Sequence, residues 1–144
     1  MAEIVKVQVE AGLAVVTIDR PEALNALNDE TLAGLEAAFI TLGNDKSVRA
    51  VILTGAGKAF VAGADIKAMA GFSAVEARSF AHRGQRIFNL IEEFPHPVIA
   101  AVSVGPNNLF FTSHTRQGPC GTKVMLCATR SASGPKRSLR RESR

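Results

Sequence analysis

The chain has 144 residues, 47% of them apolar and 21% charged, which excludes a disordered chain and fits one domain with a substantial core. No apolar run approaches the ~20 residues of a membrane-spanning helix. The first residues, MAEIVKVQVE, lack the basic start and apolar stretch of a signal peptide. No membrane association is therefore expected, and a cytoplasmic location is favoured.

The net charge of +4 hides two compositions that meet near Val102. Residues 1–103 carry nine Lys and Arg against twelve Asp and Glu, a net charge of −3, whereas residues 104–144 carry eight against one, a net charge of +7. Both cysteines, Cys120 and Cys127, lie in the second part, and neither a CxxC pair nor a His pair accompanies them. No metal site and no disulfide is expected, so the two cysteines are interpreted as free thiols.

The chain opens with two apolar segments separated by a turn. Val5, Val7 and Val9 alternate on one face, and Gly12 permits a turn, so a β-hairpin is predicted over residues 4–18.

A helix is predicted next, over residues 30–43, with Asn28 or Asp29 as its N-cap. Its apolar stripe consists of Leu32, Leu35, Phe39 and Leu42. The run over residues 48–54 is apolar enough to predict a strand that is covered on both faces.

Two more helices and a strand complete the regular pattern. A short helix is predicted to start near Asp65, and the capping box formed by Ser73 and Glu76 predicts a longer one over 74–93. Residues 98–102 predict a further strand. Because strands alternate with helices, the pattern indicates an α/β domain whose sheet is largely parallel after the hairpin.

After Val102 the pattern fails. Residues 104–144 hold one short apolar run and no sustained period, so a disordered tail is predicted. The run KRSLRRESR raises the alternative of a nucleic-acid-binding arm. Aromatic residues are not interleaved with this run, so no nucleic-acid partner is expected.

The segment KAFVAGADIKAM, residues 58–69, carries the strongest functional signal. Its small residues let backbone N–H groups approach a ligand, and a turn between a strand and a helix is a common place for oxyanion-stabilising donors. The alternative is that these residues only allow close packing and that Asp65 only caps a helix.

Four pieces together resemble the N-terminal part of the enoyl-CoA hydratase/isomerase (crotonase) superfamily, with short-chain enoyl-CoA hydratases as the nearest likeness. They are IDRPEALNAL, AVILTG, KAFVAGADIKAM and FPHPVIAAV, in order within residues 3–102. The resemblance implies an N-terminal fragment of the ββα spiral of the ClpP/crotonase fold. It also implies homotrimers stacked into hexamers, although this chain is not expected to form them. The implied substrates are acyl-CoA thioesters in fatty acid β-oxidation, with no separate cofactor.

The resemblance also implies site residues. The backbone N–H of Ala64 is expected to be one of two oxyanion donors to the thioester oxygen. The residues expected to line the CoA groove are Ala23, Leu24, Ala26, Ala62, Gly63, Ala64, Asp65, Ile66 and Lys67. Asn25 is interpreted as a turn former, and neither His82 nor His96 is assigned as a general base.

The likeness stops at Val102. A hydratase would continue with a Gly-rich turn ending in Gly-Cys-Glu and later a Phe-Gly-x-Pro-Glu loop, which supply the second donor and both catalytic glutamates. The only acidic residue after Val102 is Glu142. The chain is therefore expected to be inactive in the syn hydration of 2-trans-enoyl-CoA to 3-hydroxyacyl-CoA. An ancestral isomerase or 3-hydroxybutyryl-CoA dehydratase activity and a non-catalytic acyl-CoA-binding fragment stay open.

An out-of-frame C-terminus would explain the break. Read in another frame, the codons permitted for residues 125–139 allow A-L-C-D-x-I-R-I-x-A-E-A-K-F. That string resembles the family's segment before its second glutamate loop. We therefore divide the chain into a crotonase-like part, residues 1–103, and a basic tail, residues 104–144.

Overall fold

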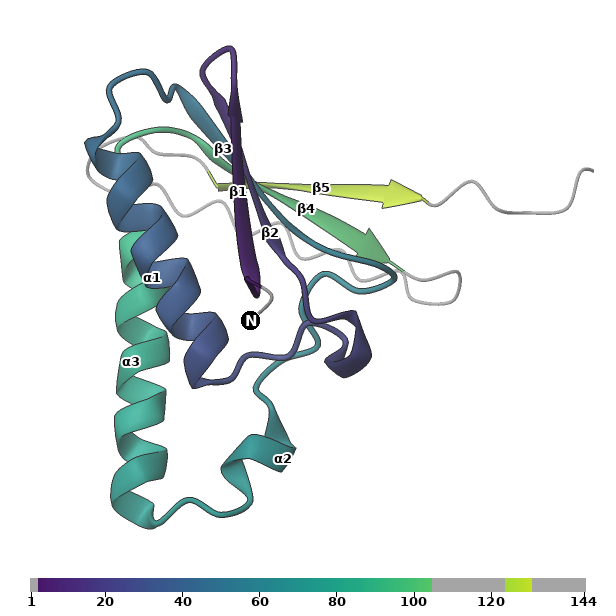
Figure 1. The fold of residues 1–144 in the computed structure, drawn as a ribbon, viewed down its shortest axis with the longest axis vertical. Helices are drawn as coiled ribbons and strands as arrows, with labels where there is room; N and C mark the ends of the chain where they lie inside the picture. The colour runs from purple at the N-terminus through teal and green to yellow at the C-terminus, as the bar shows by residue number, and fades with distance from the viewer. Residues whose placement is uncertain (1–2, 105–123, 131–144) are drawn as a thin grey trace, which may run out of the picture.

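The computed structural model describes residues 3–104 and 124–130, with side chains for residues 3–102, and it contains one five-stranded sheet (Figure 1). Its strands, in spatial as well as chain order, are β1 (Val5–Glu10), β2 (Leu13–Ile18), β3 (Ala50–Gly55), β4 (Val98–Val104) and β5 (Val124–Arg130). β1 and β2 are antiparallel, and every later pair is parallel. The predicted hairpin and the largely parallel sheet are confirmed.

The helices begin at the capping residues that the sequence predicts. They are α1 (Asp29–Asn44), α2 (Ile66–Met69) and α3 (Ala74–Glu92), with a 3-10 turn η1 at Pro21–Ala23. The Asn28 side chain accepts a hydrogen bond from the N–H of Thr31 at 2.9 Å, and Ser73 and Glu76 form the reciprocal capping box. These bonds satisfy N–H groups that have no partner within a helix.

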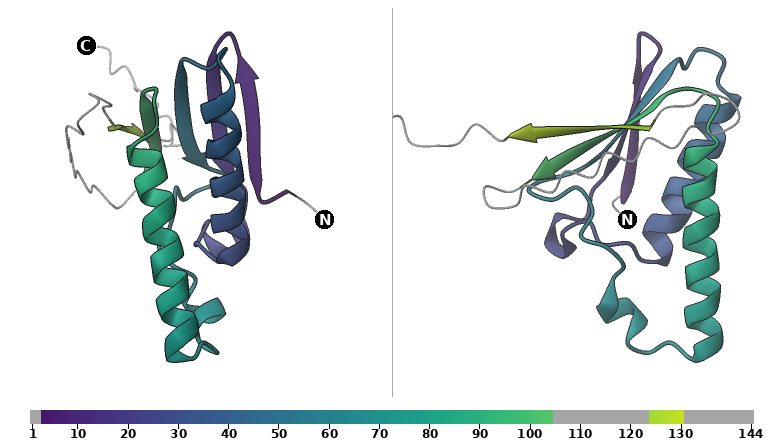
Figure 2. Two further views of the ribbon diagram at one scale, coloured as in Figure 1. Left: turned by 90° about the vertical axis from the view of Figure 1, so that its left-hand side faces the viewer. Right: turned by 180° about the vertical axis from the view of Figure 1, so that it is seen from behind.

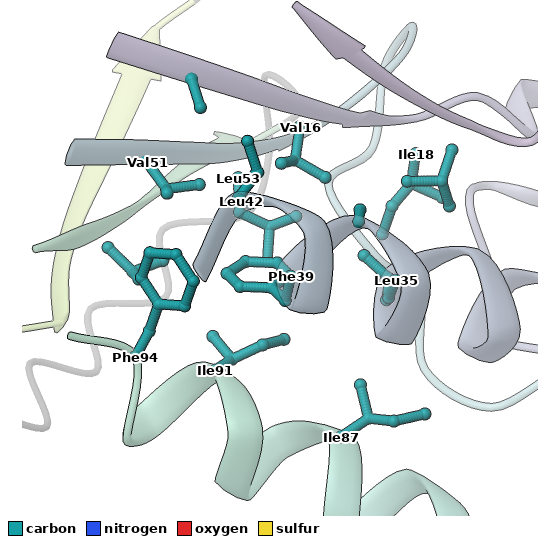
Figure 3. Close-up of a cluster of buried hydrophobic side chains, with 14 of the residues drawn as sticks. Val16, Ile18, Leu35, Phe39, Leu42, Val51, Leu53, Ile87, Ile91 and Phe94 are labelled. Carbon is teal, nitrogen blue, oxygen red and sulfur yellow. The ribbon is translucent and has the colours of Figure 1, made fainter. Parts of the chain in front are cut away.

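The core lies between the sheet and the two long helices. Figure 2 shows α1 and α3 side by side in front of the strands. Side chains from β2, β3, α1 and α3 converge between these layers (Figure 3), where the Phe39 and Phe94 rings meet edge to face at 5.3 Å. The predicted stripe residues are buried, namely Leu32, Leu35, Phe39, Leu42, Phe80, Ile87, Ile91 and Phe94.

The prediction that β3 is covered on both faces was wrong. Val51 and Leu53 are buried, but Ile52 and Thr54, which point to the other face, are only partly buried. The reason is that α1 and α3 lie on the same side of the sheet, and no described helix covers the other side. A continuous apolar run indicates a buried strand without saying how many faces are covered.

Part of the predicted disordered tail is a strand. β5 pairs with the whole length of β4 in parallel, from Val98 opposite Val124 to Val104 opposite Arg130. Its sequence, VMLCATR, is the short apolar run of the tail, and pairing with β4 satisfies backbone groups that an open edge would expose. The other residues of the predicted tail lie outside the described part of the chain. The boundary predicted at residue 103 falls inside β4.

The candidate site lies where β2 and β3 end. These strands are parallel neighbours, and their last residues, Ile18 and Gly55, are register partners. The loops that follow them, residues 19–28 and 56–65, therefore leave the sheet at the same edge. Binding sites in open α/β sheets are found at such carboxyl edges.

Candidate functional site

Backbone hydrogen bonds join the two loops at this edge. The N–H of Ala62 donates to the carbonyl of Leu24 at 3.2 Å, and the N–H of Leu27 donates to the carbonyl of Gly63 at 2.8 Å. The N–H of Asp65 returns to the carbonyl of Leu27, also at 2.8 Å. Residues 24–27 and 62–65 thus form a short parallel bridge that lies outside the main sheet.

This bridge leaves the N–H of Ala64 available. Leu27 bonds to the residues before and after Ala64, so the N–H and C=O of Ala64 point away from Leu27, as alternate residues do in a parallel ladder. Among the hydrogen bonds of the described residues, none has this N–H as its donor. Ala64 is also exposed. The loop therefore presents one fixed, accessible backbone donor.

Asn25 is buried beneath the loops. Its side chain is 0% exposed and its φ is +57°, in the left-handed region that Asn tolerates better than most residues. Its carbonyl oxygen accepts from the N–H of Arg20 at 2.8 Å. Its amide donates to the carbonyls of Ala56 and Ala59, at 2.8 and 2.7 Å. One side chain therefore connects the two loops in both directions.

Gly55 allows this approach. A Cβ at this position would lie 2.2 Å from the carbonyl oxygen of Phe60, 2.5 Å from that of Ala59 and 2.6 Å from the amide nitrogen of Asn25. Such separations are shorter than atoms tolerate, so the loop can fold back over the end of β3 only with glycine at its start.

Arg20 and Asp65 form an ion pair across the same two loops. Nη2 of Arg20 lies 3.0 Å from Oδ2 of Asp65, and Nη1 donates to the carbonyl of Ala26 at 2.7 Å. The two side chains are 15% and 14% exposed. The other oxygen of Asp65 caps α2 by accepting from the N–H of Ala68 at 3.2 Å. The Ala68 N–H and then Arg20 hold the pKa of Asp65 below its ordinary value.

The structure brings the predicted site residues together at one edge. Residues 23–26 and 62–65 belong to the two bridged loops, and Ile66 and Lys67 lie exposed on the short α2 that follows. The Asp65 carboxylate, however, is already engaged by Arg20 and Ala68. The two histidines of the described residues do not join this edge: His82 lies exposed on α3, and His96 packs near Phe94.

Sequence reasoning missed two residues of this edge. It gave Arg20 no role and treated Asn25 as a turn former. The left-handed backbone of Asn25 confirms the turn, but its buried side chain does more than permit one. A usable signal was the position of Arg20 and Asp65, since each follows one of two strands that were predicted to be parallel.

Other features of the described residues lie elsewhere or are absent. A groove of about 560 Å³ lies between β1 and α1, with Val5, Val7, Gly34 and Ala38 among its lining residues, away from the bridged loops. The described residues hold no group of three His, Cys, Asp or Glu side chains that is placed to bind a metal ion. None of the described helices is long and apolar enough to cross a membrane.

Comparison with solved structures defines the class of protein. An enoyl-CoA hydratase from Bacillus anthracis superposes with a TM-score of 0.68 at 29% identity, over 70% of this chain and 40% of that one. An enoyl-CoA hydratase from Mycobacterium smegmatis gives 0.66 at 40% identity, over 69% and 39%. The bridged loops thus belong to an α/β domain of the crotonase fold.

The sequence places the chain within that class. Residues 8–105 match the family model "Enoyl-CoA hydratase/isomerase", and the chain belongs to this family. A crotonyl-CoA hydratase from Syntrophomonas wolfei and a short-chain-enoyl-CoA hydratase from Clostridium acetobutylicum are each 50% identical to it over 95 residues. That match covers 65% of this chain but 36% of each relative, so the chain spans little more than a third of their length.

Proposed function

We propose that this chain binds acyl-CoA thioesters and provides one half of an enoyl-CoA hydratase site. The N–H of Ala64 carries the proposal, because the bridge to Leu27 fixes it, no described acceptor uses it, and Ala64 is exposed. Relatives named crotonyl-CoA hydratase and short-chain-enoyl-CoA hydratase support this choice of ligand.

The hydration reaction needs such a donor to stabilise the charge that develops on the thioester oxygen. When water adds to the β-carbon of a 2-trans-enoyl-CoA, negative charge builds on the thioester oxygen. An N–H held in advance at ~3 Å from that oxygen stabilises the charge, and removing one such donor typically lowers the rate by ~10²–10³. We assign the Ala64 N–H to this role in the family's reaction.

The surrounding loops supply the surface for CoA. We assign Ala23, Leu24 and Ala26 on one loop, and Ala62 and Gly63 on the other, to this surface, where Leu24, Ala62 and Gly63 are exposed. Ile66 is 79% exposed and offers an apolar surface to the adenine. Lys67 lies beside it, where its ammonium group can meet a phosphate. The contribution of Asp65 to this groove comes from its backbone, since its carboxylate is already paired.

The 144-residue chain by itself is expected to hydrate no substrate. General acid–base hydration needs carboxylates placed around a water, and Glu142 is the only carboxylate of the sequence after Val102. This favours the alternative of a non-catalytic acyl-CoA-binding fragment. Residues that would separate hydratase from isomerase or dehydratase ancestry belong to the part of the family pattern that this sequence lacks. We do not expect this chain to form the trimers and hexamers of the family, because it lacks that same part of the family pattern.

Two measurements on the same sample test the proposal. We expect the chain to bind butyryl-CoA in a calorimetric titration and to show no loss of crotonyl-CoA absorbance above the uncatalysed rate. Ala64→Pro, which removes the N–H, should weaken butyryl-CoA binding, whereas Ala74→Pro at the first position of α3, where proline is tolerated, serves as a matched control. Binding of neither CoA nor butyryl-CoA by the unaltered chain would refute the proposal, and measurable turnover would refute the expected inactivity.

We further infer that residues 104–144 are translated out of frame. The change in composition near Val102 and the out-of-frame resemblance of residues 125–139 support this. Sequencing the coding DNA decides it: a single-base shift near the Val102 codon should restore the family pattern. If no such shift restores it, the inference fails.

A further inference from the structure

We infer that Arg20, Asn25 and Asp65 act together as positioning residues for the Ala64 N–H. We call these three residues the polar clamp. The inference rests on the proposed function for the identity of the ligand, but the clamp itself is a property of the described contacts. None of the three side chains needs to touch the ligand.

Asn25 forms the buried part of the clamp, next to the end of β3. Its amide nitrogen donates both hydrogens to carbonyls of the second loop, residues 56–65. Its oxygen accepts from the N–H of Arg20 in the first loop, residues 19–28. Because the side chain is 0% exposed, water cannot replace these partners. The distance between the two loops is therefore set by one rigid amide at the end of β3, next to Gly55.

Arg20 forms the part of the clamp that is next to Ala64 and α2. Its planar guanidinium reaches the carbonyl of Ala26 with one arm and the Asp65 carboxylate with the other. Lysine has no such fork, so it cannot hold both partners in one geometry. The second oxygen of Asp65 holds the first turn of α2. The clamp thus acts directly on the residue after Ala64.

Ala64 lies between Gly63 and Asp65, whose backbone groups are both bonded to Leu27. The peptide that follows it carries the N–H of Asp65, which is bonded to Leu27. Movement of Asp65 by a fraction of an ångström would tilt the adjacent Ala64 peptide and its donor. Transition-state stabilisation by fixed donors depends on such geometry, and a misplacement of about 1 Å can lower a rate ~10²-fold.

A pair of ligands separates positioning from general stability. Butyryl-CoA has the thioester carbonyl, and its thioether analogue S-butyl-CoA lacks it but keeps the rest of the molecule. The unaltered chain should prefer butyryl-CoA by about two- to tenfold, the effect of one hydrogen bond. In Asp65→Asn, which keeps a good N-cap for α2, and in Arg20→Lys, the ratio should fall to about one.

The control is Arg86→Ala, which removes an exposed arginine paired with Glu36 on the far helices. It should leave the ratio of the two affinities unchanged. If Asp65→Asn and Arg20→Lys weaken both ligands equally and keep the ratio, the residues are structural only and the inference is overturned. An unchanged affinity for both ligands overturns it as well.

Amide hydrogen exchange tests the clamp without any ligand. In the unaltered chain, the amides of Leu27 and Asp65 should be protected and that of Ala64 should exchange rapidly. Asp65→Asn and Arg20→Lys should lower protection at Leu27 and Asp65 at least tenfold while core amides such as Val16 keep theirs. Unchanged protection at Leu27 and Asp65 refutes the clamp. If the chain binds neither CoA ligand, the proposed function fails, and the exchange result still decides the clamp.

Discussion

The core between the sheet and helices α1 and α3 differs in kind from the polar clamp at the ends of β2 and β3. The core consists of apolar side chains contributed by four elements, and its contacts need the right shape but little direction (Figure 3). The clamp uses a few directional hydrogen bonds between two loops, made by polar and charged side chains. The core therefore determines whether the loops meet at all, and the clamp determines the positions of individual backbone atoms.

The largest effect is expected in the core. Phe39 is 1% exposed and packs against Phe94, so Phe39→Ala should lower the free energy of unfolding by about 3–5 kcal/mol. Urea denaturation followed by circular dichroism measures it. The matched control is Ile40→Ala on the next residue, which is 51% exposed and should have a small effect. Equal effects of the two changes would contradict the assigned core.

Gly55→Ala tests the junction between core and clamp. Its new methyl group would collide with backbone atoms of Ala59 and Phe60, so a loss of about 1–3 kcal/mol is expected. Gly84→Ala is the control, because nothing lies within 4 Å of its added Cβ. Within α3 that change should stabilise the protein by about 0.5–1 kcal/mol. Thermal melting of the two variants should move in opposite directions.

Removing the Asn25 amide should affect the clamp more than the core. Asn25→Ala leaves the carbonyls of Ala56 and Ala59 without this donor, and a loss of about 1–3 kcal/mol is expected for such unsatisfied groups. Hydrogen exchange should rise in residues 56–65 well before it rises in the strands. Uniform loss of protection across the sheet would show instead that Asn25 supports the whole domain.

The smallest effect is expected from pH. The pKa of Asp65 is lowered in the folded protein, first by the Ala68 N–H and then by Arg20. Its contribution to stability is therefore complete above the ordinary carboxyl pKa of about 3.9 and is lost as the pH falls through the lower folded-state value. The difference in stability between the unaltered chain and Asp65→Asn should shrink over that acidic range. A difference that stays constant with pH would argue against the ion pair.

Much of the fold follows from local patterns in the sequence. Residues 4–18 carry the alternation of a hairpin, and Asn28 and Ser73 cap helices at the expected positions, because capping and periodicity depend on neighbours within a few residues. The family signature in residues 58–69 also located the loop that presents Ala64. Periodicity could not show that β3 is covered on one face, because coverage depends on which side of the sheet the helices cross.

The sequence by itself thus determined the order of the elements up to β4, the capped helices, the family and the candidate donor at Ala64. Only the tertiary structure decided that the β5 run pairs with β4 and that Asn25 is buried. It also decided that Arg20 meets Asp65, although the two lie 45 residues apart. The physical reason is that these contacts join segments that are distant in the sequence, either along paired strands or where two parallel strands end at one edge. Their partners are fixed by the register of the sheet, which local sequence does not encode.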